Sequence, residues 1–217
     1  MIELINASKK YRGRIVLNNI SLTFNDNKAY GISGVNGSGK TQLLKAICGY
    51  IVLNSGSVMQ DNNKIRNKYN FIHNAGILIG DPEFIPDKTV IENLLLIASI
   101  QNKCDKKRLS VLLKYFNLES FKDEQYSKLS LGSKKKMLII QAIMDYPKVL
   151  ILDEPFNALD KKTSEKLRSF LVHYKKNNLL ILTSHNENDL EIICDEIFEI
   201  EEGMIIWNYW LYFYCLF

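Results

Sequence analysis

Short apolar runs and amphipathic segments alternate along much of the chain. The runs bounded by polar residues or glycine predict buried strands at 29–33, 76–79, 149–152 and 179–185. Apolar residues at helical spacing predict amphipathic helices at 41–48, 90–100, 108–121 and 163–174. Strands that alternate with helices in this way indicate an α/β fold with a parallel sheet.

Two regions depart from this alternation. Residues 2–24 predict strands joined by turns, because apolar and polar positions alternate there. Residues 81–147 show helical spacing and a lysine-rich surface, which predicts a helical subdomain inserted into the α/β core. We therefore expect a single domain over 1–217, with its core at about 1–80 and 148–204 and an apolar, aromatic tail at about 205–217.

Composition adds few constraints. A chain of 217 residues buries about 70% of its unfolded surface, enough for a sizeable core. The net charge of +4 is too small to imply nucleic acid as a partner. The four cysteines are scattered without a C-x-x-C pair, which predicts reduced thiols in a cytoplasmic protein. The N-terminus lacks the basic start and long apolar run of a secretory signal.

The segment 34–41, Gly-Val-Asn-Gly-Ser-Gly-Lys-Thr, matches the phosphate-binding P-loop pattern between a predicted strand and a predicted helix. Its glycines allow positive φ and close approach to a polyphosphate. Its N–H groups and the helix dipole then attract the anion. A glycine-rich turn without a ligand is the alternative, although it seldom matches the whole pattern. The residues expected to hold the nucleotide are Gly34, Asn36, Gly37, Ser38, Gly39, Lys40, Thr41 and Gln42.

Acidic and imidazole side chains follow two predicted strands. Asp153 is suited to hold Mg²⁺, as is the Thr41 hydroxyl, and Glu154 is suited to orient and deprotonate a water molecule. Parallel strands deliver such residues to the sheet edge where ligands bind. His185 at that edge can reach a γ-phosphate or this water; alternatively, it caps the helix that begins near Glu187. Acids often simply end strands, so this pattern gains its meaning from the P-loop.

The segment 129–133, Leu-Ser-Leu-Gly-Ser, begins another predicted helix, with Ser130 a favourable N-cap by type. Lysines at 134–136 oppose the dipole of that helix, so a nearby anion would relieve the conflict; a solvated basic helix start is the alternative. Tyr11 lies in the first predicted turn, where its ring can stack on adenine or pack on the edge of the sheet.

In this order, the segments resemble the nucleotide-binding subunit of ATP-binding cassette (ABC) transporters over nearly the whole chain. The matching motifs are Walker A at 34–41, the signature motif at 129–133, Walker B at 149–154, the D-loop at 158–160, the switch histidine His185 and the aromatic A-loop residue Tyr11. The resemblance implies an ABC-type P-loop NTPase with a RecA-like core, a small antiparallel β subdomain and an inserted helical subdomain.

The family pairs two cassettes head to tail, with each ATP between Walker A of one and the signature helix of the other. The resemblance therefore implies that Ser130 and Gly132 face the ATP of a second cassette, identical or paralogous, with Asp160 also at the nucleotide site. It further implies an Mg²⁺-dependent ATPase in which Glu154 and His185 are catalytic. Such a subunit is cytoplasmic, lies on the inner face of the membrane and powers a separate transmembrane permease.

Two departures from the family pattern matter. The Ser-Leu-Gly form of the signature resembles small bacterial exporters of the antibiotic-peptide and multidrug type. Gly80 stands where the family has Gln, or in that branch often Glu, a side chain that senses Mg²⁺ and couples hydrolysis to the membrane domain. Gly80 cannot do this, and whether Asp81 replaces it is open.

Two other functions compete with transport. One is an ATP-switched module that acts on nucleic acid or ribosomes, but such relatives usually carry two cassettes or a long coiled coil, and this sequence has neither. The other is a degenerate cassette that binds ATP without hydrolysing it. Gly80 and the altered signature favour that interpretation, while Glu154 and His185 oppose it.

Overall fold

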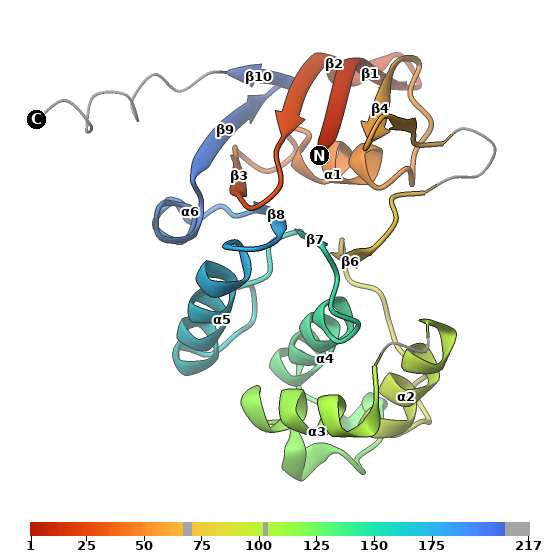
Figure 1. Ribbon diagram of the computed structural model, residues 1–217, viewed down its shortest axis with the longest axis vertical. Coiled ribbons are helices and arrows are strands. Elements are labelled where there is room, and N and C mark those ends of the chain that lie inside the picture. Colours follow the sequence, from red (N-terminus) through yellow and green to blue (C-terminus); the bar gives the residue numbers. More distant parts are fainter. Residues whose placement is uncertain (67–70, 102–103, 207–217) are drawn as a thin grey trace, which may run out of the picture.

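The computed structural model describes residues 1–66, 71–101 and 104–206 (Figure 1). Its strands form two sheets. The antiparallel sheet has the order β2-β1-β4-β5, from β1 (Ile2–Tyr11), β2 (Arg14–Phe24), β4 (Ser55–Gln60) and β5 (Asn63–Lys64). The second sheet has the order β10-β9-β3-β8-β7-β6, from β3 (Ala29–Ser33), β6 (Ala75–Leu78), β7 (Val149–Leu152), β8 (Leu179–Thr183), β9 (Glu196–Glu201) and β10 (Met204–Ile206).

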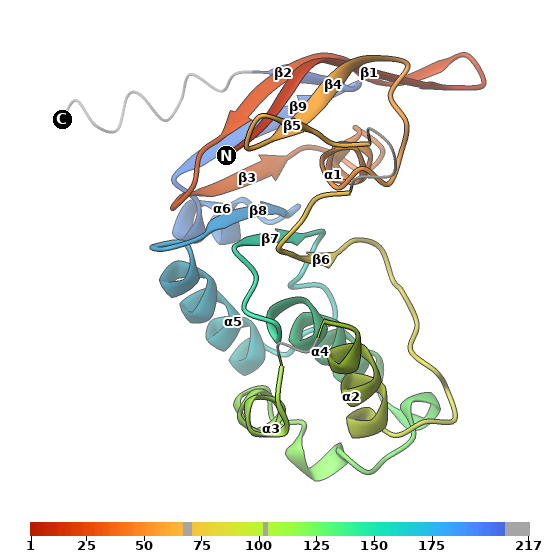
Figure 2. The same cartoon turned by 45° about the vertical axis from the view of Figure 1, so that its right-hand side comes forward.

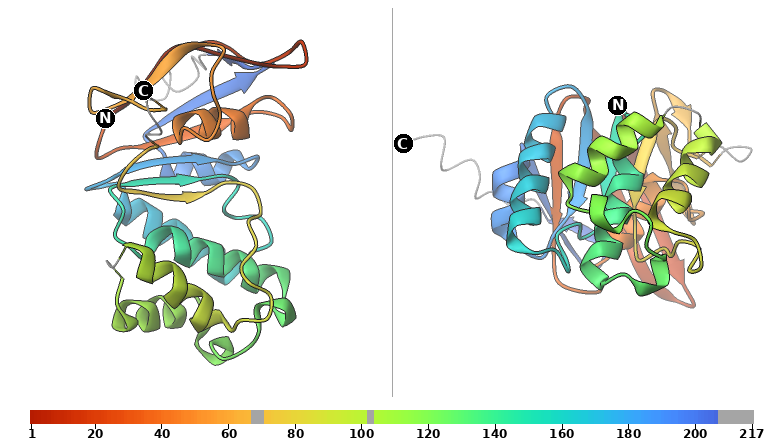
Figure 3. Two further views of the ribbon diagram at one scale, coloured as in Figure 1. Left: turned by 90° about the vertical axis from the view of Figure 1, so that its right-hand side faces the viewer. Right: turned by 90° about the horizontal axis from the view of Figure 1, so that it is seen from below.

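The helices are divided between the two faces of the second sheet. Helix α1 (Lys40–Ile47) lies between the two sheets, as the side view shows (Figure 3). The other helices lie on the opposite face: α2 (Val90–Gln101), α3 (Lys106–Tyr115), α4 (Leu131–Ile143), α5 (Lys161–Tyr174) and α6 (Glu187–Ile193). Two short 3-10 helices, η1 (Glu119–Phe121) and η2 (Tyr126–Lys128), connect α3 to α4.

Strands β7 and β8 are buried on both faces, which explains their uninterrupted apolar sequences. Alternate residues of a strand point to opposite faces. Leu150 and Leu152 accordingly pack into the core on the side of α4 and α5, whereas Val149 and Ile151 pack into the core around α1. The parallel pairing of β6, β7 and β8 was expected from these runs and is observed.

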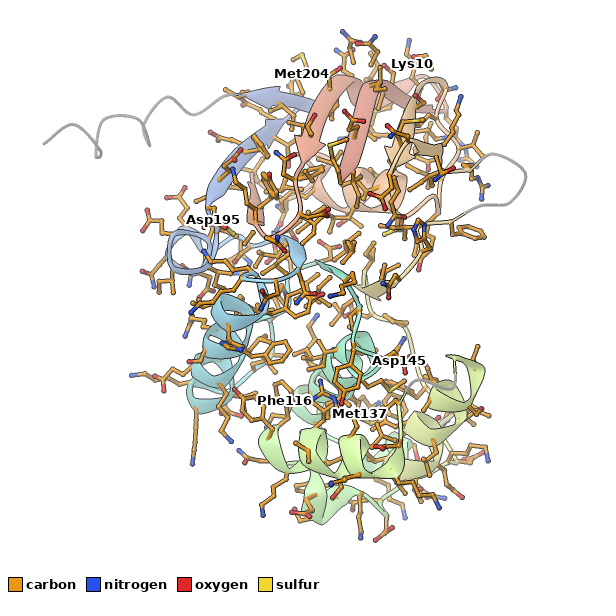
Figure 4. All side chains as sticks on the ribbon, in the orientation of Figure 1. Lys10, Phe116, Met137, Asp145, Asp195 and Met204 are labelled. Carbon is orange, nitrogen blue, oxygen red and sulfur yellow. The ribbon has the colours of Figure 1, made fainter. Side chains whose placement is uncertain are left out.

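The helices α2, α3 and α4 pack together below the sheet, next to α5 (Figures 1 and 2). Figure 4 shows Phe116 and Met137 in this layer, and both side chains are completely buried. Gly76 lets α4 pack directly on β6, because a Cβ at this position would lie 1.7 Å from the carbonyl oxygen of Ala142. The division of the chain into a core and an inserted helical subdomain remains a prediction.

One predicted helix is shorter than expected. The apolar spacing predicted a helix over 108–121, but α3 ends at Tyr115 and a separate 3-10 turn follows. Asn117 adopts φ +56°, a left-handed conformation that terminates the helix. Apolar spacing continued through this break, so the pattern alone concealed it. Most of the predicted aromatic tail, 207–217, lies outside the described residues.

Candidate nucleotide site

The carboxyl ends of the parallel strands meet at one edge of the sheet. β3 leads into the P-loop, β7 into Asp153 and β8 into Ser184 and His185. An open cavity of about 1230 Å³ lies at this edge. The predicted nucleotide-site residues that line it are Asn36, Gly37, Ser38, Gly39, Lys40, Thr41, Gln42, Asp153 and Glu154. Residues separated by more than a hundred positions therefore converge, as the parallel topology predicts.

The P-loop wraps around the ammonium group of Lys40. Lys40 Nζ donates to the carbonyl oxygen of Gly34 at 2.6 Å and to that of Val35 at 3.3 Å, and it lies 3.9 Å from Glu154 Oε1. The lysine is only 6% exposed. Its positive charge therefore lies at the N-terminus of α1, where the free N–H groups of the helix add further positive potential.

Two P-loop glycines are required by contacts with the protein itself. A Cβ at Gly34 would lie 2.4 Å from the carbonyl oxygen of Ile200, and one at Gly39 would lie 2.8 Å from that of Val16. Both residues also have positive φ, +142° and +120°. Any side chain at either position would displace the loop from strands β2 and β9, so these glycines place the loop as well as admitting an anion.

Asp153 connects the P-loop helix to the neighbouring strand. Thr41 Oγ1 donates to Asp153 Oδ2 at 2.7 Å, and Thr183 Oγ1 donates to Asp153 Oδ1 at 2.7 Å. Thr183 Oγ1 also accepts the N–H of Glu154 at 3.0 Å. The buried Thr183 thus holds both acidic residues in place, and it was not identified from the sequence.

Glu154 and His185 form a direct pair. Glu154 Oε2 lies 2.9 Å from His185 Nδ1 and accepts the His185 N–H at 3.2 Å. A carboxylate accepts this hydrogen bond from the form of His185 that carries a hydrogen on Nδ1. Glu154 has φ +47°, an unusual value for a non-glycine residue and one associated with functional sites. The pairing brings the carboxylate and the imidazole together, while the catalytic role of His185 remains a prediction.

Two buried polar atoms in the cavity wall have no hydrogen-bond partner among the described residues: Ser38 Oγ and Gln42 Oε1. Buried polar groups are almost always paired, because an unpaired group costs about 1–3 kcal/mol. Both residues were predicted to contact the nucleotide. Their unpaired atoms indicate that this part of the loop is built around a polar ligand.

Five predicted site residues outside the P-loop do not line the cavity: Tyr11, Ser130, Gly132, Asp160 and His185. Tyr11 is 43% exposed at the end of β1, and the ammonium of Lys9 lies 4.5 Å from its ring centroid. Gly34 is also absent from the cavity wall, although the carbonyls of its loop bind Lys40. The A-loop assignment of Tyr11 therefore remains a prediction.

Comparison with known proteins decides the family. A family profile described as "ABC transporter" matches residues 17–157. The chain belongs to the ABC transporter family. It is 35% identical over 206 residues to the ABC transporter ATP-binding protein YybJ of Bacillus subtilis, covering 94% of both chains. It is 32% identical over 209 residues to the bacitracin transport ATP-binding protein BcrA of Enterococcus faecalis, covering 95% of this chain and 68% of that relative.

A solved cassette has the same fold. The dimeric, post-hydrolysis structure of the ATP-binding cassette MJ0796 bound to ADP and Pi superimposes with a TM-score of 0.86 at 25% identity, covering 94% of this chain and 96% of that one. The expected ABC-type fold and ATPase class are confirmed, and the chain is an ATP-binding subunit of the transporter family. Among the described residues, no helix combines the length and apolarity that crossing a bilayer demands.

The three lysines of the cassette's signature helix have different surroundings. Lys134 Nζ lies 4.7 Å from the ring centroid of Tyr126, and Lys136 Nζ lies 3.1 Å from Asp160 Oδ2. Lys135 is 8% exposed and lines the nucleotide cavity of its own chain. The sequence left two possibilities for these lysines, a nearby anion or a solvated basic helix start. The structure gives Lys136 the Asp160 carboxylate and places Lys134 and Lys135 in the cavity wall.

The cassette's cavity also contains residues that the sequence did not reveal. The β9–β10 turn contributes 201–204, and β2 contributes Arg14, Ile15, Val16 and Asn18. The turn is attached to the P-loop, since Gly203 N–H donates to the carbonyl oxygen of Ser38 at 2.9 Å. No local motif marks these segments. Only the sheet order places β9 beside β3 and brings this turn to the P-loop.

We expect Asp160→Ala to destabilise the cassette by about 1 kcal/mol, because Asp160 is the N-cap of α5. Asp160 Oδ1 accepts the Thr163 N–H at 2.8 Å. A loss of this size lowers the Tm of a protein this long by about 2–4 °C. Asp160→Asn is the matched control, since Asn also caps helices well and this variant loses only the contribution of the negative charge. Thermal denaturation monitored by circular dichroism measures the melting temperatures of both variants. Equal melting temperatures for wild type and Asp160→Ala would exclude a capping role.

The same pair of variants gives a pH dependence. The N–H and hydroxyl of Thr163, followed by Lys136, hold the pKa of Asp160 well below its ordinary range. A carboxyl whose pKa is lower in the folded state stabilises above its unfolded pKa, near 3.9, and loses that contribution as the pH falls toward the folded pKa. The melting-temperature advantage of wild type over Asp160→Asn should therefore persist at neutral pH and decline below about pH 4.

Proposed function

We propose that this cassette binds and hydrolyses ATP to power a separate transmembrane permease, and that the transporter is an exporter. The convergence of Lys40, Asp153 and Glu154 on one cavity carries the catalytic part of this proposal. The P-loop and α1 would bind the phosphates through N–H groups and the Lys40 ammonium. Glu154 would accept the proton of the attacking water, and His185, paired with it, would contact the terminal phosphate.

The oxygen ligands at Thr41 and Asp153 fit a magnesium ion. Their side-chain oxygens lie 2.7 Å apart, and both atoms are hard donors of the kind that Mg²⁺ prefers. No cluster of three or more His, Cys, Asp or Glu side chains suited to a metal occurs in the described residues. This agrees with Mg²⁺, which usually takes one or two protein ligands and completes its shell with phosphates and water. When bound, it would neutralise the charge of the phosphates.

A second, smaller cavity of about 390 Å³ is a candidate contact surface for the permease. Its walls are formed by the segment after α1, by β6 and by the helices α2 and α4. The lining includes Tyr50, Phe71 and Ile97. Tyr50 and Phe71 are 48% and 49% exposed and pack edge to face, with ring centroids 6.2 Å apart. Partly exposed aromatic side chains are enriched in protein interfaces, which supports this surface as the docking site.

Three further elements of the proposal rest on relatives. MJ0796 is dimeric in its solved structures, which supports a second cassette as partner. The bacitracin transport protein BcrA and the Ser-Leu-Gly signature support an exporter of the antibiotic-peptide type. Association with a permease would place the cassette on the inner face of the membrane. We expect no nucleic acid to bind, since the net charge is only +4.

The permease partner can be tested with one aromatic residue. The cassette is tagged, expressed in its native host and purified from detergent-solubilised membranes. We expect a polytopic membrane protein to co-purify and Phe71→Ser to reduce its recovery several-fold, because an interface aromatic is lost. Phe121→Ser is the matched control, since Phe121 is similarly exposed at 41% and lies outside this cavity. ATPase activity stimulated by nucleic acid, with no membrane protein recovered, would contradict the proposal.

A further inference from the structure

Lys135 projects from the signature helix into the nucleotide cavity of its own chain. Lys135 follows Leu131 by four positions and precedes Leu138 by three, and all three residues line that cavity. Positions three and four apart share one face of a helix. Ser130 and Gly132, which the family resemblance directs toward a partner's ATP, do not line it. Helix α4 therefore presents the face that carries Leu131, Lys135 and Leu138 to its own nucleotide site, whereas Ser130 and Gly132 lie outside that cavity.

The environment of Lys135 is unusual for a lysine. It is 8% exposed, and its ammonium donates no hydrogen bond to the residues that the structure describes. Burial lowers its pKa, whereas the negative charges of three carboxylates oppose that shift. The carboxylates belong to Asp81, Asp153 and Glu154. Because its ammonium makes no hydrogen bond within the described residues and its side chain lines the open cavity, Lys135 is available to a further anion.

The position of Gly80 gives this lysine a role. The family has a Gln or Glu side chain at the position of Gly80, and this chain has none. A Cβ on Gly80 would meet nothing within 4 Å. Asp81, the next residue, is among the charges that act on Lys135. Lys135 is therefore the buried lysine of α4 at this cavity, and the negative charges of Asp153 and Glu154 act on it.

We propose that Lys135 binds the terminal phosphate of ATP held in its own subunit and so distinguishes ATP from ADP. With ADP, the negative charges of these three carboxylates act on the ammonium. With ATP, the γ-phosphate adds negative charge in the same cavity, which draws Lys135 and helix α4 toward the nucleotide. This inference rests on the proposed function, because it requires the cavity to bind ATP.

Nucleotide affinities test the proposal without relying on catalysis. Dissociation constants for MgADP and for a non-hydrolysable ATP analogue are measured by isothermal titration calorimetry on wild type and Lys135→Gln. Protein concentrations are kept where sedimentation shows monomer. We expect Lys135→Gln to weaken binding of the analogue roughly tenfold and of ADP less than about twofold, because only the analogue carries the γ-phosphate. Lys135→Arg retains a cation and should preserve most of the preference.

The controls separate the possible failures. Lys114→Gln removes a lysine from the exposed surface of α3, outside the cavity, and should change neither constant. If wild type binds no nucleotide, the proposed function fails. If wild type binds both and Lys135→Gln changes both equally or neither, the inference about Lys135 is overturned. Circular dichroism verifies folding, and Lys135→Met, which keeps the apolar stem, replaces Lys135→Gln if the latter unfolds.

Discussion

Glu154→Gln should reduce ATP hydrolysis by roughly a hundredfold to ten-thousandfold while ATP still binds. The carboxylate is the only acidic group in direct contact with His185 among the described residues, and it lies beside the Lys40 ammonium. An amide has nearly the same shape but cannot accept the proton of an attacking water. Binding depends on the P-loop N–H groups and Lys40, so affinity for ATP should change by less than about threefold.

Release of phosphate and binding of a fluorescent ATP derivative measure these two effects separately. Glu165→Gln is the matched control, because Glu165 is an exposed residue of α5 with no side-chain hydrogen bond among the described residues. It should leave both values unchanged. An unaltered hydrolysis rate in Glu154→Gln would show that another group accepts the proton. Loss of binding together with hydrolysis would instead make Glu154 part of the nucleotide-binding surface.

The features predicted correctly from the sequence are those with local determinants. The P-loop combines a glycine pattern with an apolar strand before it and a helix after it, all within twenty residues. The strands β7 and β8 are apolar on both faces, so their parallel, buried character was evident without knowledge of their neighbours. Because parallel strands share a carboxyl edge, Asp153 and His185 could be expected near the P-loop.

Features that depend on long-range packing could not be predicted. Thr183 is a β-branched residue in a strand, and nothing in its sequence position shows that its hydroxyl bonds both acidic residues of Walker B. Lys135 is one of three consecutive lysines, and its direction follows from the helix starting at Leu131, which sets the rotation of α4. The helix predicted over 108–121 failed because Asn117 adopts a left-handed conformation that the apolar pattern did not signal.

The location of Ser130 outside its own cavity leads to the other large prediction, the loss of an ATP-dependent dimer. Ser130 Oγ accepts the Ser133 N–H at 3.2 Å as the N-cap of α4. Asp and Asn cap helices as well as Ser does, so either can replace it without removing the cap. In a head-to-tail dimer, Asp would place a negative charge against the phosphates of the partner's ATP, whereas Asn would not.

We therefore expect Ser130→Asp, in a Glu154→Gln background that prevents turnover, to weaken ATP-dependent dimerisation by at least about a hundredfold. The repulsion acts at two symmetry-related sites, so a cost of about 1.4 kcal/mol at each site is sufficient. Ser130→Asn should still dimerise, and ATP binding by the monomer should be the same in both. Sedimentation velocity with and without ATP measures the effect. Equal dimerisation of the Asp and Asn variants would mean that the signature helix does not face a second nucleotide, because a carboxylate beside bound phosphates must oppose association.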